Sequence, residues 1–108
     1  SGTHGTHALL AAHPDVDAIV AFNDMVACGA VRALHEAGVD VPSSVRLAGC
    51  DGLDLGAVVT PPLTTLAVDM DEVAEAAVEM AVEMHAGTIP RHGARLRVSH
   101  KLLIRAST

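Results

Sequence analysis

The chain has 108 residues, half of them apolar, and a formal net charge of −6 that arises from 13 acidic residues against seven Lys and Arg. Binding to a nucleic-acid duplex rests on clustered cations, so this acidic stretch is not expected to bind DNA by itself. Its apolar runs fall short of the ~20 residues that span a bilayer, and its first residues are no signal peptide. We therefore expect a cytoplasmic protein.

The pattern of apolar residues predicts short helices that alternate with short strands. In chain order, helices are expected at about 4–12, 24–37, 53–58 and 70–86, and strands at about 18–22, 45–50, 63–68 and 96–104. Such alternation is typical of an α/β fold, with a mainly parallel sheet in three layers, flanked by helices and joined by right-handed crossovers.

Two of the predicted strands are expected to differ in burial. The strand at 18–22 is apolar without interruption, which favours a buried strand. The strand at 96–104 alternates apolar with cationic residues, which is typical of an edge strand. The longest helix carries glutamates on one face and an apolar stripe on the other, formed by Val73, Ala74, Ala77, Val78, Ala81 and Met84.

Polar side chains follow two of the predicted strands. Asn23 and Asp24 come after the strand at 18–22, and Asp51 comes after the strand at 45–50. The carboxyl ends of parallel strands are where open α/β folds bind ligands, so a polar ligand group is expected there. Two plainer roles stay open: helix capping by Asn23 and Asp24, and a turn formed by Asp51.

Several segments resemble the LacI/GalR family of bacterial transcription repressors. They are 14–24 (PDVDAIVAFND), 41–52 (VPSSVRLAGCDG), 60–65 (TPPLTT) and 103–108 (LIRAST). The resemblance covers nearly the whole chain. It implies the carboxyl-terminal portion of an effector-binding domain, a partial lobe of a periplasmic-binding-protein-like fold. It also implies that residues 69–90 belong to the other lobe and that the DNA-binding head lies outside the sequence.

The same resemblance implies which residues hold the effector, a sugar or a related polar metabolite. The main contacts would come from Asn23 and Asp51, and further contacts from Phe22, Asp24, Val68 and Met70. For Phe22, a position in the core is an equally good interpretation. The chain departs from the family's pattern at Cys50, where the family has an aromatic residue, and at Gly52, where it has a second Asp.

A homodimer is implied as well, and operator DNA would be bound only through the missing head. The residues that resemble the family's subunit interface are Cys28, Val31, Val58, Val59 and Thr60, and ordinary packing on the sheet is the alternative for them. Two-fold pairing suits such repressors because they read palindromic operators as dimers.

Other classes of protein have less support from the sequence. A periplasmic sugar-binding protein of an ABC transporter is the alternative, but the TPPLTT turn and the RAST terminus favour the repressor. No phosphate loop, dinucleotide motif or nucleophile elbow is present, so we expect no enzyme, no catalytic residue and no cofactor. His4 and His7 have no further ligand at a convincing spacing, so no metal site is predicted. Cys28 and Cys50 are expected to be reduced, structural thiols.

Overall fold

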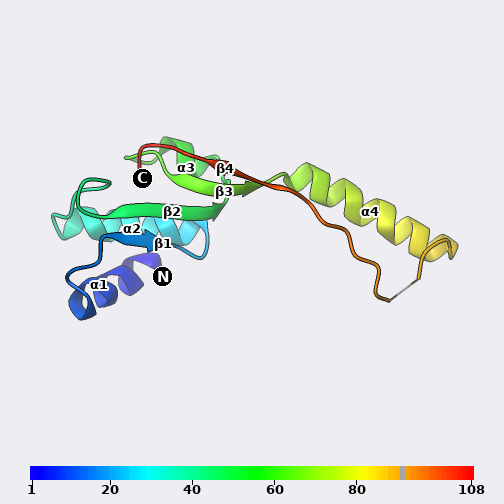
Figure 1. Ribbon diagram of the computed structural model, residues 1–108, viewed down its shortest axis with the longest axis horizontal. Helices are drawn as coiled ribbons and strands as arrows, with labels where there is room; N and C mark the ends of the chain where they lie inside the picture. The colour runs from blue at the N-terminus through cyan, green and yellow to red at the C-terminus, as the bar shows by residue number, and fades with distance from the viewer. Residues whose placement is uncertain (91) are drawn as a thin grey trace. The chain divides into compact units, whose positions relative to one another are not determined.

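A computed structural model describes residues 1–90 and 92–108 of the chain. Within these residues, helices and strands alternate (Figure 1) in the order α1 (Gly2–Ala12), β1 (Ala18–Val20), α2 (Asp24–Glu36), β2 (Arg46–Asp51), α3 (Leu55–Val58), β3 (Thr64–Val68), α4 (Met70–Ala86) and β4 (His100–Leu103). Each predicted helix and strand is present. The last strand is shorter than predicted, because its neighbour β3 ends at Val68, where the cap of α4 begins.

The strands form one sheet in the order β1-β2-β3-β4. Strand β2 pairs in parallel with β1 on one side and with β3 on the other, with Ile19 opposite Leu47 and Gly49 opposite Thr65. The predicted α/β class and the mainly parallel sheet flanked by helices are confirmed. Strand β4 lies at the edge of the sheet, as its alternating pattern predicted.

Helix α2 covers one face of the sheet, and α1 packs against α2 (Figure 1). The core between helix and sheet consists of small and aliphatic side chains, namely Ala21, Ala27, Ala30, Leu47 and Leu63. With alanines on α2, the helix can lie close to the sheet, and the buried apolar surface holds the strand ends in fixed positions.

The prediction that residues 18–22 form a buried strand is wrong. Val20 is 82% exposed and Phe22 is 88% exposed, whereas Ala21 between them is buried. Strand β1 lies at the edge of the sheet, and the alternation shows that only one of its faces is covered. Uninterrupted apolarity indicates a strand with two covered faces, and within the described residues β1 has one.

The described residues divide into two compact units. One comprises residues 1–67 and 101–108, and the other comprises residues 68–100. The first unit contains the sheet core and both polar strand ends, so the site is built from it alone. The assignment of residues 69–90 to a separate lobe remains a prediction.

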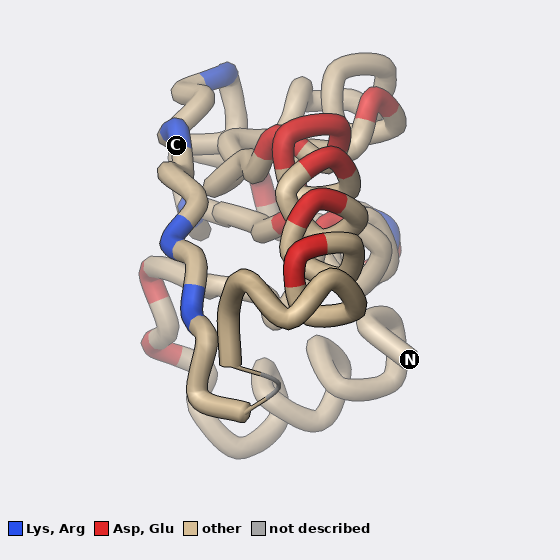
Figure 2. The backbone as a smooth tube through the Cα atoms, turned by 90° about the vertical axis from the view of Figure 1, so that its right-hand side faces the viewer, with Lys and Arg blue, Asp and Glu red and all other residues tan. Residues whose placement is uncertain are grey.

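Helix α4 belongs to the second unit. Asp69 caps it, with Oδ1 accepting hydrogen bonds of 3.1 Å from the backbone N–H groups of Asp71 and Glu72, and Gly87 ends it at φ 77°. Its acidic positions follow one another along the helix (Figure 2). The apolar stripe differs from the prediction, because the half-buried residues of α4 are Val73, Ala76, Met80 and Met84. None of the described helices is long and apolar enough to cross a membrane.

Candidate functional site

Asn23 lies where β1 leads into α2. It is the N-cap of the helix, and its Oδ1 accepts a 2.8 Å hydrogen bond from the backbone N–H of Val26. The capping role considered from the sequence is therefore present. The cap uses only the carbonyl oxygen, and the amide Nδ2 has no acceptor among the described residues, so this group can donate a hydrogen bond to a ligand.

Asp24, the next residue, is fully buried. Its Oδ1 accepts a 2.6 Å hydrogen bond from the hydroxyl of Thr65, and its Oδ2 accepts a 2.7 Å bond from the backbone N–H of Leu53. The Thr65 hydroxyl in turn accepts a 3.2 Å bond from the N–H of Gly52. We call these four residues the Asp24 brace. Both oxygens of Asp24 are occupied within the chain, so the ligand role predicted for Asp24 is replaced by a structural one.

Asp51 ends β2 and presents an exposed carboxylate. Its φ is 106°, and it is the non-glycine residue with a positive φ among those described. A side chain in this region of backbone space costs about 1–3 kcal/mol, and such strain is concentrated at functional sites. The Asp51 carboxylate has no hydrogen-bond partner within the described part of the chain, which leaves it available to a ligand.

Gly52 explains one departure from the family's pattern. Its φ is 78°, and a Cβ at this position would lie 2.4 Å from the Cβ of Ala67. A second aspartate would therefore be strained and would collide with β3. Asp51 is thus the one carboxylate at the end of β2 that this chain presents to solvent.

The carboxyl ends of β1 and β2 lie side by side, since the register pairs Val20, the last residue of β1, with Ala48. Beyond the strands, the 2.7 Å hydrogen bond from Leu53 to Asp24 joins the second residue after Asp51 to the residue after Asn23. The structure therefore brings the two corners together at the carboxyl edge of the sheet, where ligands are bound in open α/β folds.

The remaining predicted ligand contacts lie in different environments. Phe22 is 88% exposed, which excludes the core position considered for it. Val68 is half-buried at the end of β3, and Met70 is 62% exposed in the first turn of α4. Val68 and Met70 belong to the second unit, whereas Phe22 belongs to the first unit together with Asn23 and Asp51.

The predicted interface residues lie on α2 and around α3. Val31 and Thr60 line one hollow, together with His35, Val39, Asp40, Val41 and Pro61. Val58 is 76% exposed, whereas Val31 and Val59 also pack against the core. The packing of Val31 and Val59 against the core fits the alternative considered for them, and their role in pairing stays a prediction. Burial, and secondarily the charge of Asp24, raise the pKa of the Cys28 thiol, which keeps it protonated and weakly nucleophilic.

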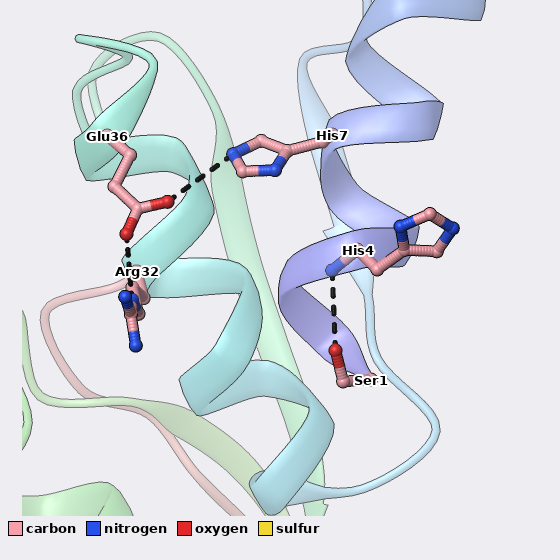
Figure 3. Close-up of polar contacts among 5 residues, drawn as sticks. All are labelled: Ser1, His4, His7, Arg32 and Glu36. Atoms are coloured by element: carbon pink, nitrogen blue, oxygen red, sulfur yellow. Dashed lines mark hydrogen bonds and ion pairs between the residues drawn. The ribbon is translucent and has the colours of Figure 1, made fainter.

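The side chains of His4 and His7 on α1 point in different directions, and only that of His7 points toward Glu36 (Figure 3). The Nε2 atom of His7 lies 3.6 Å from Oε2 of Glu36, and Oε1 of the same carboxylate accepts a 2.8 Å hydrogen bond from Nε of Arg32. The backbone N–H of His4 donates to the hydroxyl of Ser1. No group of three His, Cys, Asp or Glu side chains among the described residues could hold a metal ion.

Two buried hydroxyl residues, Thr65 and Ser107, have structural roles that were not predicted from the sequence. Thr65 belongs to the Asp24 brace, and Ser107 is buried near the amino ends of β2 and β3. The Ser107 hydroxyl donates a 2.6 Å bond to the carbonyl of Leu47 and accepts a 2.8 Å bond from the N–H of Thr64. Their position in apolar segments could have indicated these roles, because a hydroxyl that is buried among apolar residues requires a hydrogen-bond partner.

Comparison with known proteins is consistent with this geometry. Residues 3–108 match a family model described as a periplasmic binding protein-like domain. The chain is 32% identical over 103 residues to the ribose operon repressor of Halalkalibacterium halodurans, a match that covers 95% of this chain and 31% of the repressor.

Solved structures give the same result. A LacI family transcriptional regulator from Arthrobacter sp. FB24, in complex with lactose, has a TM-score of 0.89 and 38% identity, covering 99% of this chain and 41% of that one. The transcriptional regulator CelR, in complex with cellobiose, has a TM-score of 0.94 and 28% identity, covering 100% of this chain and 33% of that one. The chain thus spans about a third of the length of these relatives. They are named as transcriptional regulators, not as enzymes.

Proposed function

Because the chain belongs to the LacI family of transcriptional regulators, and matches its periplasmic binding protein-like domain, we propose that it is part of a sensor for a small sugar. The observation that carries the proposal is the exposed carboxylate of Asp51, held on a strained backbone beside Asn23. A carboxylate accepts hydrogen bonds from two hydroxyls at once, which suits a polyol, and the Asn23 amide supplies a donor.

The names of the relatives support the class of ligand. One of them is a ribose operon repressor, and two were solved with lactose and with cellobiose. We propose a sugar of this kind for the present chain. Phe22 supplies an exposed aromatic face next to Asn23 in the sequence. The contacts expected from Val68 and Met70 stay a prediction, because both residues belong to the second unit.

Binding would regulate transcription through the whole protein. The sugar favours one arrangement of the lobes over another, and this difference in affinity shifts the population. A coupling of about 1–3 kcal/mol per site is sufficient for regulation. We propose that the protein acts in the cytoplasm as a homodimer, paired through the surface of Val31, Val58 and Thr60, and that operator DNA is bound by another part of it.

The test is calorimetric titration of the whole protein that carries this chain with lactose, cellobiose and D-ribose. Asp51→Asn is expected to weaken binding about tenfold or more, because the amide keeps a single acceptor and adds donors. Operator affinity without sugar should stay unchanged.

Asp54→Asn is the matched control. Asp54 is an exposed aspartate three positions further along, and its side chain makes no capping hydrogen bond to α3. If Asp51→Asn leaves the sugar affinity unchanged, or if both variants weaken it equally, the assignment of Asp51 is wrong.

A further inference from the structure

The Asp24 brace includes Gly52 and Leu53, the two residues that follow Asp51 and its exposed carboxylate. We propose that Asp24 and Thr65 are positioning residues, which hold Asp51 in its strained conformation and so aim its carboxylate at the ligand. This inference rests on the proposed function, since it assigns Asp51 to sugar binding.

The first support is the route of the hydrogen bonds. Asp51 itself has φ 106°, a conformation that an L residue leaves unless its neighbours fix it. The N–H of Gly52 is bound by the Thr65 hydroxyl, and the N–H of Leu53 is bound by the Asp24 carboxylate. Both amides that follow Asp51 are therefore held by side chains from other elements.

The second support is the space made for the carboxylate. A Cβ at Gly49 would lie 2.2 Å from Oδ1 of Asp24, so only glycine in β2 leaves room for it. The 2.6 Å bond between Asp24 and Thr65 is fully enclosed. A buried carboxylate is costly unless its acceptors are used. Here one donor, the N–H of Leu53, belongs to the turn after Asp51, and the other, the hydroxyl of Thr65, also binds the N–H of Gly52 in that turn.

A purely structural role for the brace makes a different prediction. Ser107 is an equally buried hydroxyl that joins Leu47, near the amino end of β2, to Thr64, the first residue of β3. If the brace served stability alone, loss of the Ser107 hydroxyl would affect sugar binding as much as loss of the Thr65 hydroxyl. If the brace positions Asp51, only the Thr65 change reaches the ligand.

The experiment compares Thr65→Val, Thr65→Ser and Ser107→Ala in the whole protein that carries this chain. Lactose, cellobiose and D-ribose are titrated by calorimetry, and backbone hydrogen exchange is followed by mass spectrometry in peptides that cover 50–54 and Thr64, whose N–H is bound by the Ser107 hydroxyl. Valine has the shape of threonine without its hydroxyl, and serine restores the hydroxyl. Asp24→Asn breaks the brace by a second route if Thr65→Val does not fold.

In Thr65→Val we expect exchange at Gly52 and Leu53 to be at least ~10-fold faster and sugar affinity to be at least ~10-fold weaker, as two lost hydrogen bonds imply. Thr65→Ser should restore both. Ser107→Ala should accelerate exchange at Thr64 and leave the affinity within ~2-fold of wild type.

The proposal is overturned if Thr65→Val binds sugar like wild type, or if Ser107→Ala weakens binding to the same extent. Unchanged exchange at Gly52 and Leu53 in Thr65→Val would also overturn it. If the wild-type protein takes up none of the three sugars, the proposed ligand class fails. The exchange data then still decide whether the brace holds the corner of Asp51.

Discussion

At the amino ends of β2 and β3, the hydroxyl of Ser107 joins the carbonyl of Leu47 to the N–H of Thr64. Just beyond the carboxyl end of β2, the carboxylate of Asp24 joins Leu53 to Thr65, the neighbour of Thr64 in β3. The side chains of Ser107, Asp24 and Thr65 are buried and hydrogen-bonded. The two junctions differ in charge and in strain, because only the one at the carboxyl end of β2 combines a buried carboxylate with a residue at φ 106°.

The difference indicates that one junction serves mainly the stability of the sheet, whereas the other also holds the residues of the candidate site. A neutral hydroxyl between extended strands costs little to bury once it is bonded. A buried carboxylate and a strained aspartate are expensive, and such features persist where they serve a site. The amino ends of β2 and β3 are thus joined by a neutral hydroxyl, and the carboxyl end of β2 carries the exposed carboxylate of Asp51.

The largest effect is expected when the carboxyl end is broken. Asp24→Ala leaves the Leu53 N–H and the Thr65 hydroxyl without their acceptor, and should lower the free energy of unfolding by about 3 kcal/mol. Urea denaturation of the chain measures this change. A loss as small as that of an exposed aspartate such as Asp54 would contradict the structural weight given to the brace.

Breaking the amino end should cost less. Ser107→Ala removes a neutral hydroxyl and leaves the Thr64 N–H unpaired, which is expected to lower the unfolding free energy by about 2 kcal/mol. Ser107→Thr, which retains the hydroxyl, is the control for hydrogen bonding. If urea unfolding shows a larger loss for Ser107→Ala than for Asp24→Ala, the ranking of the two ends is reversed.

Relief of the strain should separate stability from binding. Asp51→Gly places at φ 106° the residue that adopts it without a Cβ penalty, so the chain is expected to gain about 1 kcal/mol of stability. The same variant of the whole protein should lose its sugar affinity. Thermal unfolding measures the stability, and calorimetry measures the sugar affinity. If Asp51→Gly is less stable than wild type, the conformation of Asp51 is not strained.

The smallest effect is expected far from both ends. The hydrogen bond from Arg32, together with the nearby charges, holds the pKa of Glu36 below its usual range. A carboxylate of lowered pKa stabilises the fold above its unfolded pKa, and this contribution is lost as the pH falls through the folded value. Both groups are exposed, so Glu36→Gln should shift the urea midpoint only slightly at pH 7. The shift should vanish in acid, and a shift that grows there would contradict the sign.

Much of the fold could be predicted from local chemistry. The cap at Asn23, the cap at Asp69 and the glycine at 87 mark helix ends by hydrogen bonds within a few residues, so the sequence carries these signals directly. The exposure of Val20 and Phe22 could not be predicted in this way, because it depends on which strand lies at the edge.

The candidate site, too, was predictable from the sequence only in part. Its polar residues could be found because they follow apolar runs, and Asn23 and Asp51 were found by that rule. The role of Asp24 could not, because its partners lie 29 and 41 positions away.

The sequence by itself determined the order of helices and strands, the acidic charge and the polar residues at the strand ends. These follow from periodicity and from hydrogen bonds between near neighbours. Only the tertiary structure decided which carboxylate is buried in a brace and which is exposed on a strained turn. That choice depends on packing between segments distant in the chain, and Gly49, Thr65 and Leu53 together leave Asp24 inside and Asp51 outside.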